Sequence, residues 1–129
     1  MQVVKVTKLR GASICTWHQL MHGAYLWDPI GQTSTNSFKG TFDGCGYKIT
    51  NMKVDVSTNS GSLCAGLFGL VEAGVEGKGI VKNIIVSGEV KSTGVGNSYT
   101  GGIVGQSMGG AVRNSSFVGD VTASGGEYT

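Results

Sequence analysis

Three side chains near the amino terminus have a spacing that could hold a metal ion. Cys15, His18 and His22 follow a C-x2-H-x3-H pattern, which places both histidines on one face if the segment is helical. Zinc takes thiolate and imidazole ligands, but a site also needs a fourth ligand or a water, and usually a partner knuckle. The sequence offers no such partner, so we interpret these residues as part of a structural helix and expect neither a metal nor a cofactor.

Stacked charges are the second feature that could do chemistry. Among the acidic residues only Glu89 and Asp120 coincide when the repeats described below are aligned, and Lys82 coincides with Arg113. Two carboxylates could hold a cation or a proton, but a solvated pair beside a turn is the simpler interpretation. The stacked cations indicate an exposed edge that discourages misassociation. No nucleophile elbow, phosphate loop or dinucleotide fingerprint is present, so the sequence predicts a non-enzyme.

An internal repeat must position these residues. Three apolar segments share an asparagine, at intervals of 32 and 31 residues: KITNMKVDV, IVKNIIVSGEV and AVRNSSFVGDV, aligned on Asn51, Asn83 and Asn114. Amides stacked at strand spacing can bond one another along a column, because each amide both donates and accepts. We therefore expect the three asparagines to form a structural ladder, with a ligand-binding role as the alternative.

A five-residue glycine motif recurs beside the asparagine segments. It reads AGLFG at 65–69 and GGIVG at 101–105, and its repeat glycines are Gly66, Gly69, Gly102 and Gly105. Glycine is required where a chain turns a corner with positive φ or where backbones pass closely. The motifs keep their form while the joins between them vary in length, which is typical of stacked layers with surface loops.

The repeat predicts the fold. Each motif is a short apolar run bounded by Gly, Asn or Ser, which indicates strands separated by turns. A period near 31 residues with several strands favours an all-β, right-handed parallel β-helix (β-solenoid) of about three to four coils, with equivalent residues about 4.8 Å apart. We expect Ile84, Val86 and Val90 inside one coil, beneath Ser115, Phe117 and Val121. The expected strands lie near 48–56, 65–70, 80–90, 101–105 and 111–122.

The first 30 residues do not follow the repeat. The segment 11–27 has apolar residues at helical spacing, which predicts a short amphipathic helix that covers the open end of the solenoid. Before it, QVVKV alternates apolar and polar residues, and Val3, Val4 and Val6 make it a candidate assembly strand. The chain is thus one domain, with a strand and helix at 1–30 and repeats at 31–129.

The segment FKGTFDGCGYKITNMKV at 38–54, with PIG before it and the two glycine motifs after it, resembles the GLUG-motif repeat proteins. The resemblance covers roughly residues 27–129. It implies a β-helical region of a large bacterial surface or secreted protein, such as the adhesin-like proteins and the non-catalytic N-terminal regions of some IgA-cleaving metallopeptidases. One departure is Cys45, where the related pattern commonly has Asn. A Cys-Gly turn lacks an amide that could bond its own backbone, so we expect this corner to be held differently.

Composition limits the compartments and partners. The net charge is only +2 and Lys and Arg form no dense block, which argues against nucleic acid. No apolar run approaches the roughly 18 residues of a membrane span. The three cysteines are an odd number, so we expect buried, reduced side chains, with a Cys45–Cys64 bridge as the alternative.

Three functions follow from these observations. The first is a non-enzymatic structural or adhesive module of a cell-surface or secreted bacterial protein, although the chain as given contains no signal peptide. The second is a subunit that stacks head to tail into an extracellular filament through its N-terminal strand. The third is a carbohydrate-binding or carbohydrate-processing β-helix. The expected partners are adjacent repeats, identical subunits, or host and cell-wall glycans.

Overall fold

Apolar residues alternating with polar ones produce most of the strands. In β2 (Lys48–Thr58) the side chains of Ile49, Met52 and Val54 are buried, whereas their neighbours are exposed. The computed structural model describes residues 26–59, 61–75 and 79–125, and within them it contains strands and no α-helix. The other strands are β1 (Thr41–Asp43), β3 (Leu63–Ala65), β4 (Phe68–Glu72), β5 (Ile80–Lys82), β6 (Ile85–Gly94), β7 (Ser98–Thr100), β8 (Val104–Met108), β9 (Ala111–Arg113) and β10 (Ser116–Ser124).

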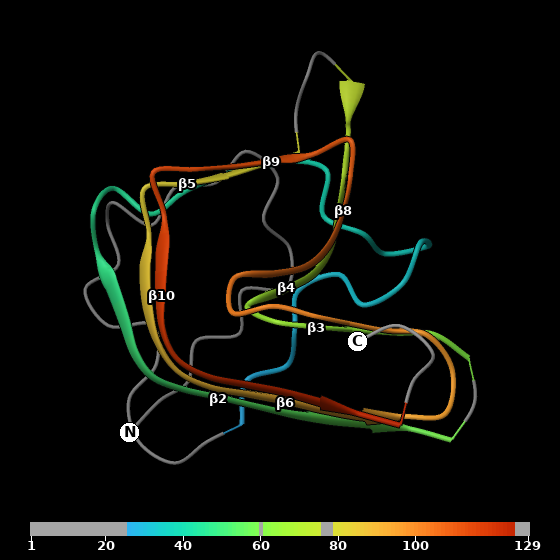
Figure 1. The fold of residues 1–129 in the computed structure, drawn as a ribbon. Helices are drawn as coiled ribbons and strands as arrows, with labels where there is room; N and C mark the ends of the chain where they lie inside the picture. Colours follow the sequence, from blue (N-terminus) through green and yellow to red (C-terminus); the bar gives the residue numbers. More distant parts are fainter. Residues whose placement is uncertain (1–25, 60, 76–78, 126–129) are drawn as a thin grey trace.

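The strands form four parallel sheets because the chain returns to the same position once per repeat. Their orders are β1-β5-β9, β10-β6-β2, β3-β7 and β4-β8. Strands β1 to β4 therefore make a first layer, β5 to β8 a second, and β9 and β10 the start of a third. Figure 1 looks along this stack, where β2, β6 and β10 follow one another around a bend. This arrangement confirms an all-β fold with stacked repeats.

The layers stay in register although their lengths differ. Ile80 of β5 pairs with Ala111 of β9, and Ile85 of β6 pairs with Ser116 of β10, so both pairs are 31 residues apart. Between β4 and β8 the separation is 36, as in Phe68 with Val104. The five extra residues lie in the join before β5, where the chain is long, and the join before β9 is short. This confirms the sequence-based expectation that the joins between the motifs vary in length.

The strands expected near 80–90 and 111–122 are each divided in two at an asparagine. Asn83 separates β5 from β6 and Asn114 separates β9 from β10, and both have a left-handed backbone, with φ of 57° and 46°. Asparagine tolerates this conformation better than most residues. The two residues occupy equivalent corners, since the strands on either side pair at the same 31-residue separation.

Asn51 does not belong to this column, so the ladder of three asparagines is wrong as a set. Asn51 also has a left-handed backbone, with φ of 57°, but it lies within β2 at a β-bulge between Ile49 and Met52. The corner of the first layer is instead Gly44, whose N–H donates to the carbonyl of Lys82 at 2.8 Å. The shared asparagine misled the alignment because a bulge and a corner both need a residue that accepts positive φ.

The repeat glycines lie where backbones pass closely. A Cβ on Gly66 would be 2.8 Å from the carbonyl oxygen of Gly101, and one on Gly105 would be 2.8 Å from that of Ala65. A Cβ on Gly69 would meet the carbonyl oxygen of Gly31 at 2.6 Å. At Gly102 the obstacle is a side chain, because the Phe117 ring lies over it. A residue with a Cβ atom therefore does not fit at these positions unless its neighbours shift.

The interior is a continuous apolar core with one polar region. Phe68 is its centre, with the rings of Phe38 and Phe42 at centroid distances of 4.8 and 5.3 Å. Ile84, Val86 and Val90 are fully buried, as expected from the sequence, and Phe117 packs against the core while half-buried.

The polar region lies between β6 and β7, where three hydroxyl groups bond one another. Ser92 Oγ is 2.9 Å from Ser98 Oγ and 2.7 Å from Thr100 Oγ1. Mutual hydrogen bonds remove the free-energy cost of burying hydroxyl groups.

The segment before β1 covers part of the first layer, on the side that faces away from the second layer. The Trp27 N–H donates to the Lys53 carbonyl at 2.7 Å, and the Trp27 indole donates to the Leu67 carbonyl at 3.0 Å. Ile30 and Phe38 form isolated parallel bridges to β4. The predicted helix at 11–27 lies outside the described residues except for Leu26 and Trp27, which are not helical. The candidate assembly strand of Val3, Val4 and Val6 lies entirely outside them.

Candidate functional site

The corner that departs from the related pattern is held by Asp43. Its Oδ1 accepts a hydrogen bond from the Cys45 N–H at 2.9 Å and another from Asn83 Nδ2 at 3.0 Å. The Asn83 amide, the Cys45 N–H and the nearby charge of Lys82 hold the pKa of Asp43 below its ordinary value, against a smaller opposing effect of burial. Asp43 therefore links the first layer to the second, in place of an amide at position 45.

The cysteines agree only in part with the sequence-based expectation of buried, reduced side chains, which holds for Cys64 and not for Cys45. Cys45 is disulfide-bonded, whereas Cys64 is a free and buried thiol, so the Cys45–Cys64 bridge is wrong. The Cys64 thiol donates to Gln106 Oε1 at 3.5 Å. Burial raises the pKa of Cys64, which keeps it in the thiol form. Cys64 is thus a poor nucleophile.

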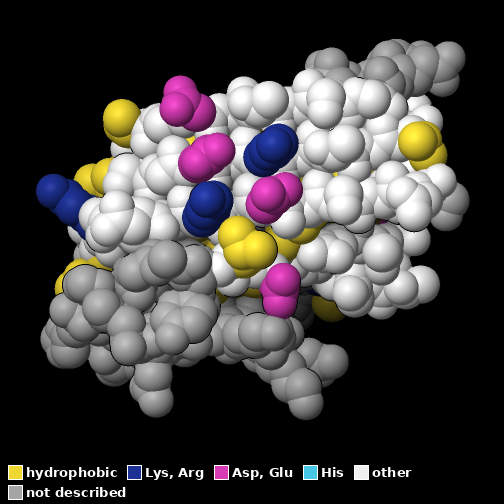
Figure 2. All heavy atoms as spheres, turned by 90° about the horizontal axis from the view of Figure 1, so that it is seen from below, with side chains coloured by type: hydrophobic (Ala, Val, Ile, Leu, Met, Phe, Trp, Pro, Cys, Tyr) yellow, Lys and Arg dark blue, Asp and Glu magenta, His cyan; other side chains and the backbone are white. Residues whose placement is uncertain are grey.

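Charged residues form rows across the sheets, as the sequence alignment predicted for two pairs. Glu89 pairs with Asp120 in the β6–β10 register, and Lys82 pairs with Arg113 in the β5–β9 register. The first layer adds an opposite charge to each row, because Lys53 pairs with Glu89 and Asp43 pairs with Lys82. Figure 2 shows acidic and basic side chains side by side on the underside of the molecule. Each row therefore begins with an opposite-charge pair and ends with a like-charge pair.

A second carboxylate ties the 31–40 segment to β4. Glu72 accepts a hydrogen bond from the Ser37 hydroxyl, and Lys39 Nζ lies 3.5 Å from the same Glu72 oxygen. The Ser37 hydroxyl, followed by the Lys39 cation, lowers the pKa of Glu72. These contacts hold the segment that forms one wall of the pocket described next.

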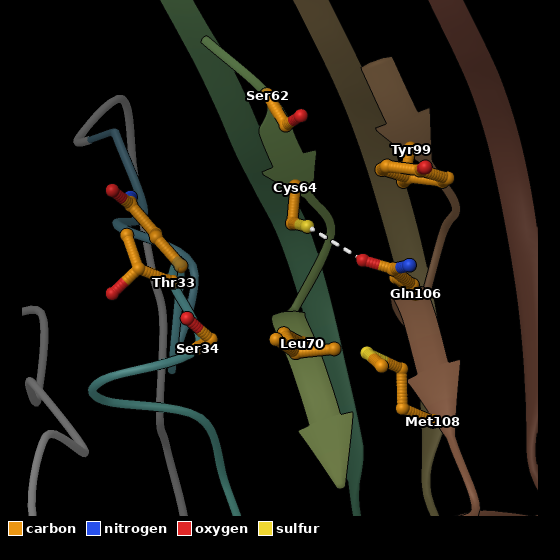
Figure 3. A pocket seen from close by; sticks show the side chains of 9 residues that line it. Thr33, Ser34, Ser62, Cys64, Leu70, Tyr99, Gln106 and Met108 are labelled. Atoms are coloured by element: carbon orange, nitrogen blue, oxygen red, sulfur yellow. Dashed lines mark hydrogen bonds between the residues drawn. The ribbon is translucent and has the colours of Figure 1, made fainter. Parts of the chain in front are cut away.

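An uncharged pocket of about 320 Å³ lies between the 32–34 loop and the outer faces of β3, β4, β7 and β8. Figure 3 shows Thr33 and Ser34 on one side, Cys64 and Leu70 in the middle, and Tyr99, Gln106 and Met108 on the other side. The Cys64 thiol orients the Gln106 amide, since it donates a hydrogen bond to the amide oxygen. The pocket can offer hydroxyl groups, an amide and an aromatic ring to a neutral ligand.

Sequence reasoning missed this pocket because its residues come from the 32–34 loop and from the first two layers, which lie far apart in the chain. No signal in the repeats marks them, since Tyr99 and Gln106 flank the glycine motif and Thr33 precedes the first asparagine segment. Cys15, His18 and His22, whose spacing could hold a metal but which we interpreted as part of a structural helix, lie outside the described residues. Within the described residues, no three His, Cys, Asp or Glu side chains form a group that could hold a metal, and no helix is long and apolar enough to cross a membrane.

The parallel layers and glycine contacts define a stacked-repeat protein. Residues 96–122 match the GLUG motif in a comparison with protein families, which confirms the resemblance seen in the sequence. The match runs from just before β7 into β10 and includes Gly102 and Gly105. No curated protein and no solved structure matches the chain significantly.

Proposed function

We propose that this chain is a right-handed parallel β-helix that serves as a non-enzymatic structural or adhesive module of a bacterial cell-surface or secreted protein. The observation that carries the proposal is the in-register stacking of parallel strands around a GLUG motif. A repeat that stacks only on its neighbours gives an elongated, rigid body suited to presenting or spacing other regions. Right-handedness is supported by the general preference of parallel crossover connections.

The disulfide at Cys45 supports export from the cytoplasm. Structural disulfides persist in oxidising compartments and are rare in the reducing cytosol. Cys45 is half-buried in the turn between β1 and β2 of the first layer. An exported module therefore accounts for a bonded cysteine here better than an intracellular protein does.

Localisation and attachment provide the test. Antibodies against the chain are applied to intact source cells, to the culture medium and to lysed cells. We expect labelling of intact cells or of the medium, and a signal restricted to lysates contradicts export. Beads coated with the native chain should then be retained by host cells or bacterial walls if the module is adhesive. Beads coated with the reduced and unfolded chain are the matched control, and equal retention of the two contradicts adhesion.

The uncharged pocket favours carbohydrate binding as a second candidate function. A sugar offers hydroxyl groups and apolar ring faces, which match the Gln106 amide, the Ser and Thr hydroxyls and the Tyr99 ring. Neutral oligosaccharides are titrated into the chain and into a Tyr99→Ala variant, with Tyr47→Ala as the control outside the pocket. Binding that weakens only with Tyr99→Ala supports this candidate, and no saturable binding to any neutral oligosaccharide contradicts it.

The filament alternative depends on residues outside those described. It requires Gln2–Thr7 of one molecule to add to the last layer of the next. Deletion of residues 1–7 followed by light scattering tests it, because a filament should shorten or disperse when the donor strand is removed. A full-length chain that is monomeric at high concentration contradicts it.

A further inference from the structure

The end of the stack exposes side chains of a kind that the inner layers bury. Val112 of β9 pairs with Val81, and Val121 of β10 pairs with Val90. Val81 and Val90 are fully buried, whereas Val112 is 44% exposed and Val121 is 45% exposed. Phe117, which belongs to the same inner row of β10, is only half-buried. The surface formed by β9 and β10, here called the end face, is thus an interior type of surface that no layer covers within the part of the chain that the structure describes.

The backbone of the end face is also available for pairing. β9 and β10 are the last strands of their sheets, and within the described residues nothing pairs with their outer edges. An open parallel edge with apolar side chains beside it is a template for one more strand.

The charge rows specify what that strand should carry. In the inner layers an opposite charge lies across each row, since Lys53 faces Glu89 and Asp43 faces Lys82. At the end face the rows finish with Asp120 beside Glu89 and with Arg113 beside Lys82. Like charges on adjacent strands are destabilising, and a neighbour of opposite charge offsets the repulsion. Among the residues that the structure describes, no cation lies opposite Asp120 and no anion lies opposite Arg113 on the open side of the end face.

A second copy of this chain does not supply that cation simply by stacking head to tail. The matching residue of the second copy would be Lys53 of β2, the strand at the other edge of the β10-β6-β2 sheet. The Lys53 carbonyl already accepts the Trp27 N–H, so the backbone of residue 27 lies where β10 of another molecule would have to pair. Ile30 and Phe38 cover β4 in the same way.

We propose that the end face is a docking surface for a further coil of the same repeat type, and that this coil carries Lys or Arg opposite Asp120 and Asp or Glu opposite Arg113. The charge complementarity of the rows selects which coil docks, and the exposed valines and Phe117 supply the buried apolar area. This inference rests on the β-helical architecture proposed above and does not depend on an adhesive role.

Two extended chains test the charge requirement. Residues 101–125 are copied after Thr129, because Tyr128-Thr129 repeats Tyr99-Thr100 and keeps the repeat in phase. One extension is an unchanged copy, and the other carries Asp120→Lys and Arg113→Glu in the copy only. At low salt we expect the complementary extension to melt roughly 2–4 °C higher, from two cross-strand pairs of about 0.5 kcal/mol each. The difference should shrink in 0.5 M NaCl because salt screens exposed pairs. When Asp120→Lys is also made in the original layer, the lysine in the copy no longer faces a carboxylate. Its contribution to the higher melting temperature should then be lost.

Hydrogen exchange separates docking from charge selection. Both extensions should slow exchange of the β10 amides relative to the unextended chain. Unchanged exchange overturns the docking surface, and equal melting temperatures at low salt overturn the charge requirement. If the unextended chain dimerises and Val121→Lys abolishes the dimer, the occupant is a second copy and the proposal is wrong. Circular dichroism of the unextended chain tests the architecture separately, since a spectrum without dominant β-structure contradicts the proposed function itself.

Discussion

One row of apolar residues shows how differently the same position behaves in the first two layers and at the end face. Val54, Val90 and Val121 stack in one row, with exposed fractions of 0%, 0% and 45%. The residue type and the strand are equivalent in all three layers. What changes is the cover: Val90 has a layer on each side, Val54 has the second layer on one side and the segment around Trp27 beside its strand on the other, and Val121 has one neighbouring layer within the described residues. Burial in this protein is therefore conferred by the next layer and not by the local sequence.

This difference implies an uneven distribution of stability. In stacked repeats the stability is approximately a sum of repeat terms and interface terms between neighbours. The second layer has a neighbouring layer on each side, the first has the second layer on one side and the segment before β1 on the other, and the third has one neighbouring layer within the described residues. We therefore expect equivalent substitutions to cost more in layers one and two than in layer three, and the following predictions test this contrast.

The largest effect is expected at the centre of the core. Phe68→Ala should lower the free energy of unfolding by about 3–5 kcal/mol, since it removes a ring that contacts both Phe38 and Phe42. Phe117→Ala is the matched variant in the third layer and should cost clearly less, because Phe117 is half-buried. Urea denaturation followed by circular dichroism measures both. Equal losses would show that the third layer is as well packed as the core.

The valine row gives the closest comparison. Val90→Ala should cost about 2 kcal/mol, from two lost carbon atoms and the cavity they leave. Val121→Ala should cost less than about 1 kcal/mol, because the Val121 side chain is nearly half exposed. The two variants are compared by thermal and urea unfolding. A larger loss for Val121 would indicate that the end face is covered in solution.

The Asn83 corner should contribute about 1–3 kcal/mol. Asn83→Ala removes the hydrogen bond to Asp43 and places alanine in a left-handed conformation, which costs about 1–2 kcal/mol. Asn83→Gly separates the two causes, since glycine accepts the backbone angle but still lacks the amide. Melting temperatures of both variants provide the measurement. An unchanged melting temperature for Asn83→Ala would mean that neither the bond nor the conformation stabilises the fold.

The smallest effect is a pH dependence that originates at Asp43. Its pKa is lowered in the folded chain, so its stabilising contribution is present above the ordinary Asp value near 3.8 and is lost as pH falls through the folded pKa. Asp43→Asn should therefore lose less stability than the parent between pH 6 and pH 3. Asp55→Asn on β2 is the control, and Glu72 retains its own acid-dependent contribution in both variants. Identical pH profiles for Asp43→Asn and the parent would contradict the role of the carboxylate.

The sequence identified the repeat well and the corners less well. The 31-residue period, the charge pairs and the interior positions of Ile84, Val86 and Val90 follow from spacing, because strand periodicity and stacking act on each residue in the same way. The alignment of Asn83 with Asn114 was right and that of Asn51 with them was wrong, and the Asn83 amide bonds Asp43. One residue type can satisfy both a bulge and a corner, and only the hydrogen-bond register distinguishes them.

By itself the sequence determined the all-β class, the layered repeat and the GLUG motif, since these depend on local alternation and on a regular period. Only the tertiary structure decided that Cys45 is bonded while Cys64 is free, and that Asp43 holds the corner. The same is true of the pocket between Thr33 and Tyr99, because its walls come from different layers. The end face likewise emerges only from the stack, because a valine is an interior residue or a surface residue according to whether another layer lies against it.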